Sequence, residues 1–143
     1  MASNSELYLM TQLLNLEEVR VIDYRIIEGS GIILSLEKTK KEVVCPSCGQ
    51  TTELLHQNNF QTVRDLSFGQ QPVYLKINRR RMRCPHCQNK FTEELDFVRR
   101  KRIYTKRFVE KIIEEVLNSD IKNVAKRNDL REQEIETMLK DLG

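Results

Sequence analysis

The spacing of apolar residues along the chain predicts first a helix and then a pair of strands. Four apolar side chains recur at helical intervals between Ser5 and Leu16, as on one face of a helix. Two strand-like stretches follow, Val19–Ile27 and Ile32–Glu37, and in the second of them apolar residues alternate with other residues. Because Gly29-Ser30-Gly31 between them tolerates positive φ angles, the pattern predicts a β-hairpin.

The middle of the chain predicts a second hairpin and one further short strand. Phe60–Leu66 and Val73–Met82 have strand patterns on either side of a turn at Gly69–Pro72, and Phe91–Leu95 is a candidate for a third strand. In the second strand, arginines continue the face on which the apolar side chains begin. This predicts either that the face passes from buried to exposed or that a bulge interrupts the strand.

From Thr105 onward the apolar period becomes helical. An apolar stripe of three turns ends at Leu117, and Ser119 or Asp120 is placed to cap a short helix behind it. A tight turn at 128–130 contains an Asn-Asp pair, which reaches the left-handed conformation in place of Gly. The last helix has apolar residues at i, i+3, i+4 and i+7, namely Ile135, Met138, Leu139 and Leu142. These lengths are typical of a helix-turn-helix unit.

The composition is that of a foldable globular protein. The chain has 143 residues, of which 39% are hydrophobic and 31% charged, enough for one ordinary domain or for two or three very small ones. No apolar run is long enough to span a membrane, and the first ten residues lack the features of a signal peptide. We therefore expect a cytoplasmic protein without membrane contact.

Four cysteines stand in two close pairs, Cys45-Pro46-Ser47-Cys48 and Cys84-Pro85-His86-Cys87. Disulfides are disfavoured in the cytosol, whereas two Cys-x-x-Cys pairs offer the four thiolates that Zn²⁺ accepts in a tetrahedron. Each pair adjoins a predicted strand, as in a zinc ribbon, and the 35 residues between the pairs hold the second hairpin. One structural Zn²⁺ bound by Cys45, Cys48, Cys84 and Cys87 is the favoured interpretation. Redox-active cysteines or another metal are the alternatives.

A catalytic zinc would need an open coordination position, usually with His or carboxylate ligands. The two histidines are His86, between two cysteines, and His56, in a polar loop, and we expect both at the surface. The fold class predicted is α+β. It comprises an N-terminal helix and β-hairpin in residues 1–44, a zinc ribbon in residues 45–97, and a helix-turn-helix-like unit of three helices in residues 98–143.

The net charge of +3 conceals a strongly basic stretch. Residues 76–107 hold twelve Lys or Arg against three acids, a balance of +9, and the segments on both sides are net acidic. Local charge is what an anionic partner feels, and Arg pairs phosphates through two bonds. These basic side chains could simply form a solvated surface, but their clustering beside the zinc site favours binding of double-stranded DNA. The candidate contacts are Arg79, Arg80, Arg81, Arg83, Arg99, Arg100, Lys101, Arg102, Lys106 and Arg107.

The residues of the last helix include both candidates for DNA contact and acids that disfavour it. Arg131 and Gln133 are placed to reach bases or phosphates, as the start of a recognition helix would be. Four acids share this helix, however, and weaken the case for deep insertion into a major groove: Glu132, Glu134, Glu136 and Asp141. Base reading and a role in packing or dimerisation both stay open.

The order of motifs resembles the N-terminal half of the ISL-three family of bacterial insertion-sequence transposases. The resemblance rests on Cys45-Pro-x-Cys48-Gly, Val63-Arg64-Asp65-Leu66 before the Gly69 turn, an Arg-rich strand into Cys84-Pro-x-Cys87, and Phe91-Thr92-Glu93 before a helix-turn-helix. In that family the ribbon and helix-turn-helix bind the terminal inverted repeats of the element. The resemblance implies that the four cysteines bind zinc and that Arg64, the Arg79–Arg83 run and residues 99–107 face DNA. It also implies a bacterial protein associated with the nucleoid when bound to DNA.

In that family a following RNase H-like domain with three metal-binding carboxylates cuts and joins DNA. The chain ends at Gly143, so we expect DNA binding without catalysis, in a fragment, a shortened element or a small protein that keeps the DNA-binding half. A homodimer, or a partner chain that carries the catalytic activity, is the protein partner to expect. The rival hypothesis is a protein-interaction or regulatory adaptor that uses the ribbon against a partner and the helices for self-association.

Overall fold

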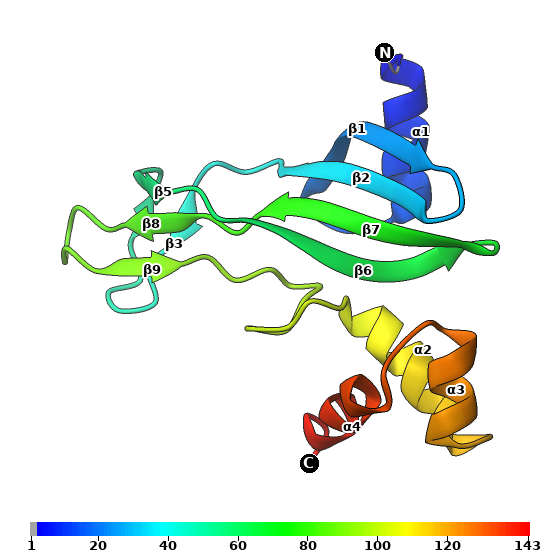
Figure 1. The fold of residues 1–143 in the computed structure, drawn as a ribbon. Helices are drawn as coiled ribbons and strands as arrows, with labels where there is room; N and C mark the ends of the chain where they lie inside the picture. The colour runs from blue at the N-terminus through cyan, green and yellow to red at the C-terminus, as the bar shows by residue number, and fades with distance from the viewer. Residues whose placement is uncertain (1–2) are drawn as a thin grey trace.

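The computed structural model describes residues 3–143 and has the predicted α+β fold (Figure 1). Within these residues, the zinc-ribbon region extends from one end of a four-stranded sheet, α1 packs on the β1 side of that sheet, and the group of three helices lies beside β6. The helices are α1 (Asn4–Leu14), α2 (Lys106–Leu117), α3 (Ile121–Arg127) and α4 (Glu132–Lys140). The strands are β1 (Val19–Ile27), β2 (Gly31–Lys38), β3 (Val43–Val44), β4 (Thr51–Thr52), β5 (Leu55–Gln57), β6 (Phe60–Phe68), β7 (Gln71–Asn78), β8 (Arg81–Arg83) and β9 (Lys90–Thr92).

The N-terminal helix and hairpin are formed as predicted, with one shorter end. Helix α1 ends at Leu14 instead of Leu16, because Asn15 adopts a left-handed φ of 51° and its amide donates to the carbonyl of Thr11. Strands β1 and β2 pair antiparallel, with a register shift at Ile22. Helix α1 packs on β1 and contributes Leu14 to the core.

The two predicted hairpins do not form separate units, because they share one sheet in the order β1-β2-β7-β6. Strands β2 and β7 run parallel at its centre, with Leu34 opposite Leu75. Gly31 lets β2 approach β7 closely, since a Cβ at this position would lie 2.4 Å from the carbonyl oxygen of Pro72. Residues of both hairpins form one hydrophobic core, to which Leu95 and Val98 also contribute. The division proposed at residue 44 therefore separates strands that pack together.

The predicted strand Val73–Met82 is interrupted. Strand β7 ends at Asn78, and the chain enters the ribbon as β8 at Arg81, in a separate sheet of order β5-β8-β9. The third strand is likewise shorter than predicted and ends at Thr92. The ribbon has its own small core of Cys45, Met82, Cys84 and Phe91.

The three C-terminal helices form the predicted helix-turn-helix-like unit and dock on β6. Thr105 caps α2 and Asp120 caps α3, and the turn before α4 has a left-handed φ of 53° at Asp129. The unit is attached to the sheet by two backbone bonds of Arg64, whose amide donates to Ile103 and whose carbonyl accepts from Thr105, both over 2.9 Å. None of the helices in the described part of the chain is long and apolar enough to cross a membrane.

Candidate zinc centre and nucleic-acid interface

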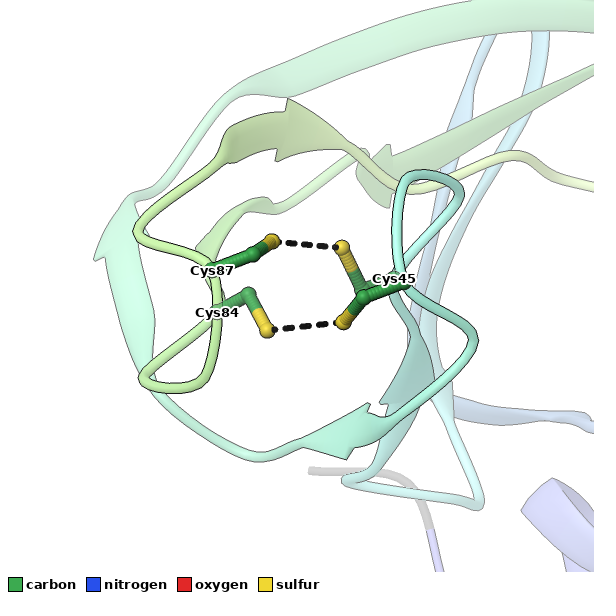
Figure 2. A group of neighbouring side chains, drawn as sticks. Cys45, Cys84 and Cys87 are labelled. Atoms are coloured by element: carbon green, nitrogen blue, oxygen red, sulfur yellow. Dashed lines mark hydrogen bonds between the residues drawn. The ribbon is translucent and has the colours of Figure 1, made fainter.

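Two loops of the same shape carry the four cysteines (Figure 2). In each loop, the amide of the residue after the second cysteine donates back to the carbonyl of the first: Gly49 to Cys45 over 2.9 Å and Gln88 to Cys84 over 2.8 Å. This residue has a positive φ in both loops, +77° at Gly49 and +65° at Gln88. The repeated turn directs all four sulfurs toward one point between the loops.

The sulfur positions fit one tetrahedral zinc ion. All four Sγ atoms lie within 4.8 Å of one another, with 3.6 Å between Cys45 and Cys87 and 3.5 Å between Cys48 and Cys84. A disulfide bond of about 2.05 Å is excluded by these distances. A tetrahedron with Zn–S bonds of about 2.3 Å has sulfur–sulfur edges of about 3.8 Å. The four cysteines therefore form a structural zinc site, as the sequence predicts.

The thiols also need a cation in order to ionise together. Burial raises the pKa of Cys45, but the amides of Cys48 and Ser47 outweigh it and lower this pKa to about 6. At Cys87 the amide of Asn89 lowers the pKa, whereas burial and the neighbouring sulfurs raise it to about 12. One thiolate thus opposes the ionisation of the next. A divalent cation removes this conflict, because it binds the thiolates and releases their protons.

The zinc site is closed on the protein side. Within residues 3–143, the four cysteines are the only group of three or more His, Cys, Asp or Glu side chains arranged to hold a metal. His56 and His86 are both exposed and belong to no such group. Four thiolates without an open position are typical of zinc that supports a fold.

Several arginines of the basic stretch are committed to the protein itself. Arg80 donates to the carboxylate of Glu93 through Nε over 2.6 Å and through Nη2 over 3.0 Å, and the Glu93 side chain is 2% exposed. The same guanidinium donates to the carbonyls of Lys40 and Lys41. Arg80 therefore clamps the ribbon to the segment that enters it, and it has little left to offer a phosphate.

Two further arginines bind acids of distant segments. Arg107 on α2 donates to Asp65 on β6 through Nε over 2.9 Å and Nη2 over 2.5 Å. Arg102 donates to both carboxylate oxygens of Asp141, over 2.7 and 2.9 Å. Hydrogen bonding to these carboxylates raises the pKa of both guanidinium groups. Both pairs hold the helical unit in place.

Arg79 and Arg64 are largely withdrawn from solvent. Arg79 is 5% exposed, and its Nε and Nη2 are buried without a hydrogen-bond partner within the described residues. Burial lowers its pKa. Arg64 lies half-buried, with its guanidinium 4.9 Å from the ring centre of Phe108. It stacks between the sheet and α2.

The remaining basic side chains of the stretch stay accessible. Arg81 is half-buried; the exposed ones are Lys76, Arg83, Lys90, Arg99, Arg100, Lys101 and Lys106. Those in the 99–106 segment line a cleft of about 970 Å³ between this segment and helices α2 and α4. The cleft lining contains six basic and six acidic residues, so its interior does not favour an anion. The exposed basic residues of this lining are Arg99, Arg100, Lys101 and Lys106, and Arg99 also donates through Nη1 to the backbone carbonyl of Asp141 over 2.7 Å.

Two of the four acids of the last helical segment, Glu134 and Asp141, are half-buried and bind arginines of the protein itself. Glu134 accepts from the amide and the side chain of Arg131, and Asp141 binds Arg102. Ile135 and Met138 are buried against α2 and α3. Helical spacing then places Gln133, Thr137 and Lys140 at the middle of the exposed face, with Glu132 and Glu136 on one side of it. The exposed residues of α4 thus include two acids, Glu132 and Glu136, and one base, Lys140.

The sequence prediction missed two lysines on α3. Lys122 and Lys126 lie one turn apart and line an open hollow of about 510 Å³ together with Arg131, Gln133 and one acid, Glu132. The signal was available in the i, i+4 spacing of these lysines on the exposed side of the first helix of the pair. In helix-turn-helix proteins this helix crosses the DNA backbone while the next enters the groove.

A ribbon with four zinc-binding thiolates is joined to a helix-turn-helix unit, so the protein belongs to the class of proteins that combine these two modules. Two family models match it in succession: the zinc-finger of transposase IS204/IS1001/IS1096/IS1165 over residues 41–92, and the helix-turn-helix domain of transposase family ISL3 over residues 93–143. The chain thus belongs to the ISL3 transposase family, as its motifs predict, and contains the zinc ribbon and helix-turn-helix of that family.

One similar protein is the transposase for insertion sequence element IS1001 from Bordetella parapertussis. The two sequences are 27% identical over 110 residues, which is 77% of this chain. The matched region spans 27% of the length of that transposase. No solved structure matches the chain significantly.

Proposed function

We propose that this chain binds double-stranded DNA and recognises the terminal inverted repeats of an insertion-sequence element. The observation that carries the proposal is the hollow between α3 and α4, where Lys122, Lys126, Arg131 and Gln133 lie together. Two lysines on the first helix are suited to phosphates, and Gln133 at the start of the second is suited to a base edge. Gln pairs with adenine through two hydrogen bonds in the major groove.

The accessible arginines and lysines outside the helix pair supply the electrostatic part of this binding. We assign phosphate contacts to Arg99, Arg100 and Lys101, which are exposed in the lining of the cleft, and to Arg81 and Arg83 on the ribbon. Arg80, Arg102 and Arg107 are assigned to the protein interior, because each already binds a carboxylate through two nitrogens. Arg64 and Arg79 would have to leave buried positions in order to reach DNA.

We further propose that residues 3–143 bind DNA without cutting it. Within these residues the cysteines form the only candidate metal group, and no carboxylate triad of the kind that cuts and joins DNA accompanies it. Strand transfer then depends on a catalytic centre outside this segment, in the same protein or in a partner.

If some residues contact phosphates and others read bases, two sets of variants should have different effects. Replacing Arg99, Arg100 and Lys101 together by Ala should weaken binding to every duplex and flatten the dependence of log affinity on log salt by about 3, because each lost phosphate contact contributes roughly 0.9. Replacing Gln133 by Ala should leave that slope unchanged and reduce the preference for the specific site by about 1–3 kcal/mol. The measurement is a salt titration of binding to specific and random duplexes.

A matched control removes the same charge elsewhere. Arg20, Lys40 and Lys41 are exposed and lie before the ribbon, so their replacement by Ala should leave the salt slope nearly unchanged. Equal flattening by both triple variants would mean that only net charge matters. A wild-type chain that binds no duplex at low salt would overturn the DNA proposal and favour the adaptor.

A further inference from the structure

An apolar surface is exposed on the side of the molecule formed by α1 and β1. The exposed fractions are 57% for Leu9 and 66% for Leu13 on α1, and 44% for Ile22 and 66% for Ile26 on β1. Tyr8 and Ile27 extend the same region of the chain. Isolated apolar side chains at a surface need no explanation, but a concentration on two packed elements indicates a contact surface.

The backbone of β1 is open at the same place. The other edge of the sheet, β6, is covered by the segment at Ile103 to Thr105. On β1, the amide of Val21 donates to Thr11 Oγ1 over 2.9 Å. From Ile22 to Ile26, no residue of the described chain beyond β2 bonds to this strand's backbone. The bulge at Ile22 and the charges of Asp23 and Arg25 disfavour pairing with an arbitrary strand, so only a partner of complementary charge fits here.

The sequence of the open edge is complementary to itself. Asp23 and Arg25 are exposed, lie on the same face of the strand, and form no ion pair within residues 3–143. When two copies of the strand pair antiparallel about a two-fold axis at Tyr24, Asp23 of each copy lies opposite Arg25 of the other. The charge pair is therefore matched twice, and Ile26 of each copy lies next to the bulge at Ile22 of the other.

We propose that this edge is a self-association surface, and that its occupant is β1 of a second copy of the chain. The two four-stranded sheets then join into one continuous sheet. Because the two-fold axis is perpendicular to that sheet, both α1 helices lie on the same face of it, one on each side of the axis, with their exposed leucines available for contact. This proposal concerns residues that the proposed DNA surface does not use, and it holds whether or not the chain binds DNA.

A charge-exchange experiment on the zinc-loaded full chain tests the register directly. The D23R variant carries two positive side chains on the edge and the R25D variant carries two negative ones. Each alone should associate with itself at least about tenfold more weakly than wild type, because attractive pairs become repulsive. Mixed together, they should form a dimer of one copy each, since both pairs are then restored. Native mass spectrometry separates the mixed dimer from the two self-dimers by mass.

Two further variants complete the test. Ile26→Lys places a charge in the apolar part of the contact and should give a monomer, whereas Lys90→Asp, a charge reversal on the ribbon edge strand β9, should leave the dimer intact. Zinc content shows that each variant is folded. A wild-type chain that is monomeric at about 100 µM, or a dimer that both single reversals leave unchanged, would overturn the proposal; so would single variants that show no preference for each other. DNA binding by a monomeric Ile26→Lys variant would separate this result from the proposed function.

Discussion

Replacing Cys84 by Ser is expected to abolish zinc binding and to unfold the ribbon, residues 43–57 and 81–92, while the four-stranded sheet and the three C-terminal helices stay folded. The buried core of the ribbon consists of Cys45, Met82, Cys84 and Phe91, with the half-buried Val43 packed against it, and two of the buried residues are ligands. So small a core cannot offset the entropy of ordering the loops. The metal contributes the missing free energy, which is about 10–16 kcal/mol for zinc-finger peptides at neutral pH. The helices have a separate core and need no metal.

Elemental analysis and amide hydrogen exchange measure this outcome. Zinc should fall from one ion per chain to a small fraction, and exchange protection should be lost at β8 and β9 but kept in α2. Ser47→Ala is the matched control, because Ser47 lies inside the first loop and its hydroxyl accepts only from Asn89. It should retain the metal. Full zinc content in Cys84→Ser would show that three thiolates suffice and that the site is open.

Replacing Asp65 by Ala is expected to destabilise the junction between the sheet and the helical unit by about 3 kcal/mol. Asp65 is 1% exposed and accepts hydrogen bonds from Thr105 Oγ1 over 2.7 Å and from two nitrogens of Arg107. The variant leaves the Arg107 guanidinium, about a third exposed, without its partner. Removing one member of a buried pair is costly for that reason, and the partial exposure of Arg107 keeps the expected loss at the low end.

Thermal unfolding is the measurement, with an expected fall in midpoint of roughly 10 °C. Asp141→Ala is the control, because Asp141 binds Arg102 with the same two-bond geometry but both side chains are more exposed, 21% and 39%. Its loss should cost under about 1 kcal/mol. If the two variants lower the midpoint equally, burial does not decide the strength of these pairs.

The zinc ligands and the helical unit were accessible from sequence because their signals are local. Two cysteines separated by two other residues already indicate the geometry of a metal-binding turn, and the turn at Asp129 follows from residues that tolerate a left-handed φ. The parallel pairing of β2 with β7 was not accessible, because nothing in the periodicity of either strand specifies which neighbour it takes. For that reason the sequence analysis placed a boundary at residue 44 between strands that share one sheet.

For the same physical reason, the sequence could only partly predict which arginines are free to contact DNA and which are bound within the protein. A run of basic residues shows charge but not its partners, and the acids that engage Arg80, Arg102 and Arg107 lie 13, 39 and 42 residues away in the sequence. Lys122 and Lys126, outside the basic run, were overlooked because they lie in a segment with a net negative charge. Position in the fold, and not local charge density, decides which basic side chains remain free.

The two cysteine pairs come from two separate excursions of the chain out of one sheet. Cys45 and Cys48 lie between β2 and β6, and Cys84 and Cys87 lie after β7. In the unfolded chain, zinc has to close a long loop to bring the pairs together, whereas the formed sheet already holds the starting points of both excursions side by side. Sheet formation therefore raises the effective concentration of one thiolate pair near the other. Metal loading during synthesis should consequently follow the sheet, and substitutions that weaken β2 or β7 should lower zinc affinity although they touch no ligand.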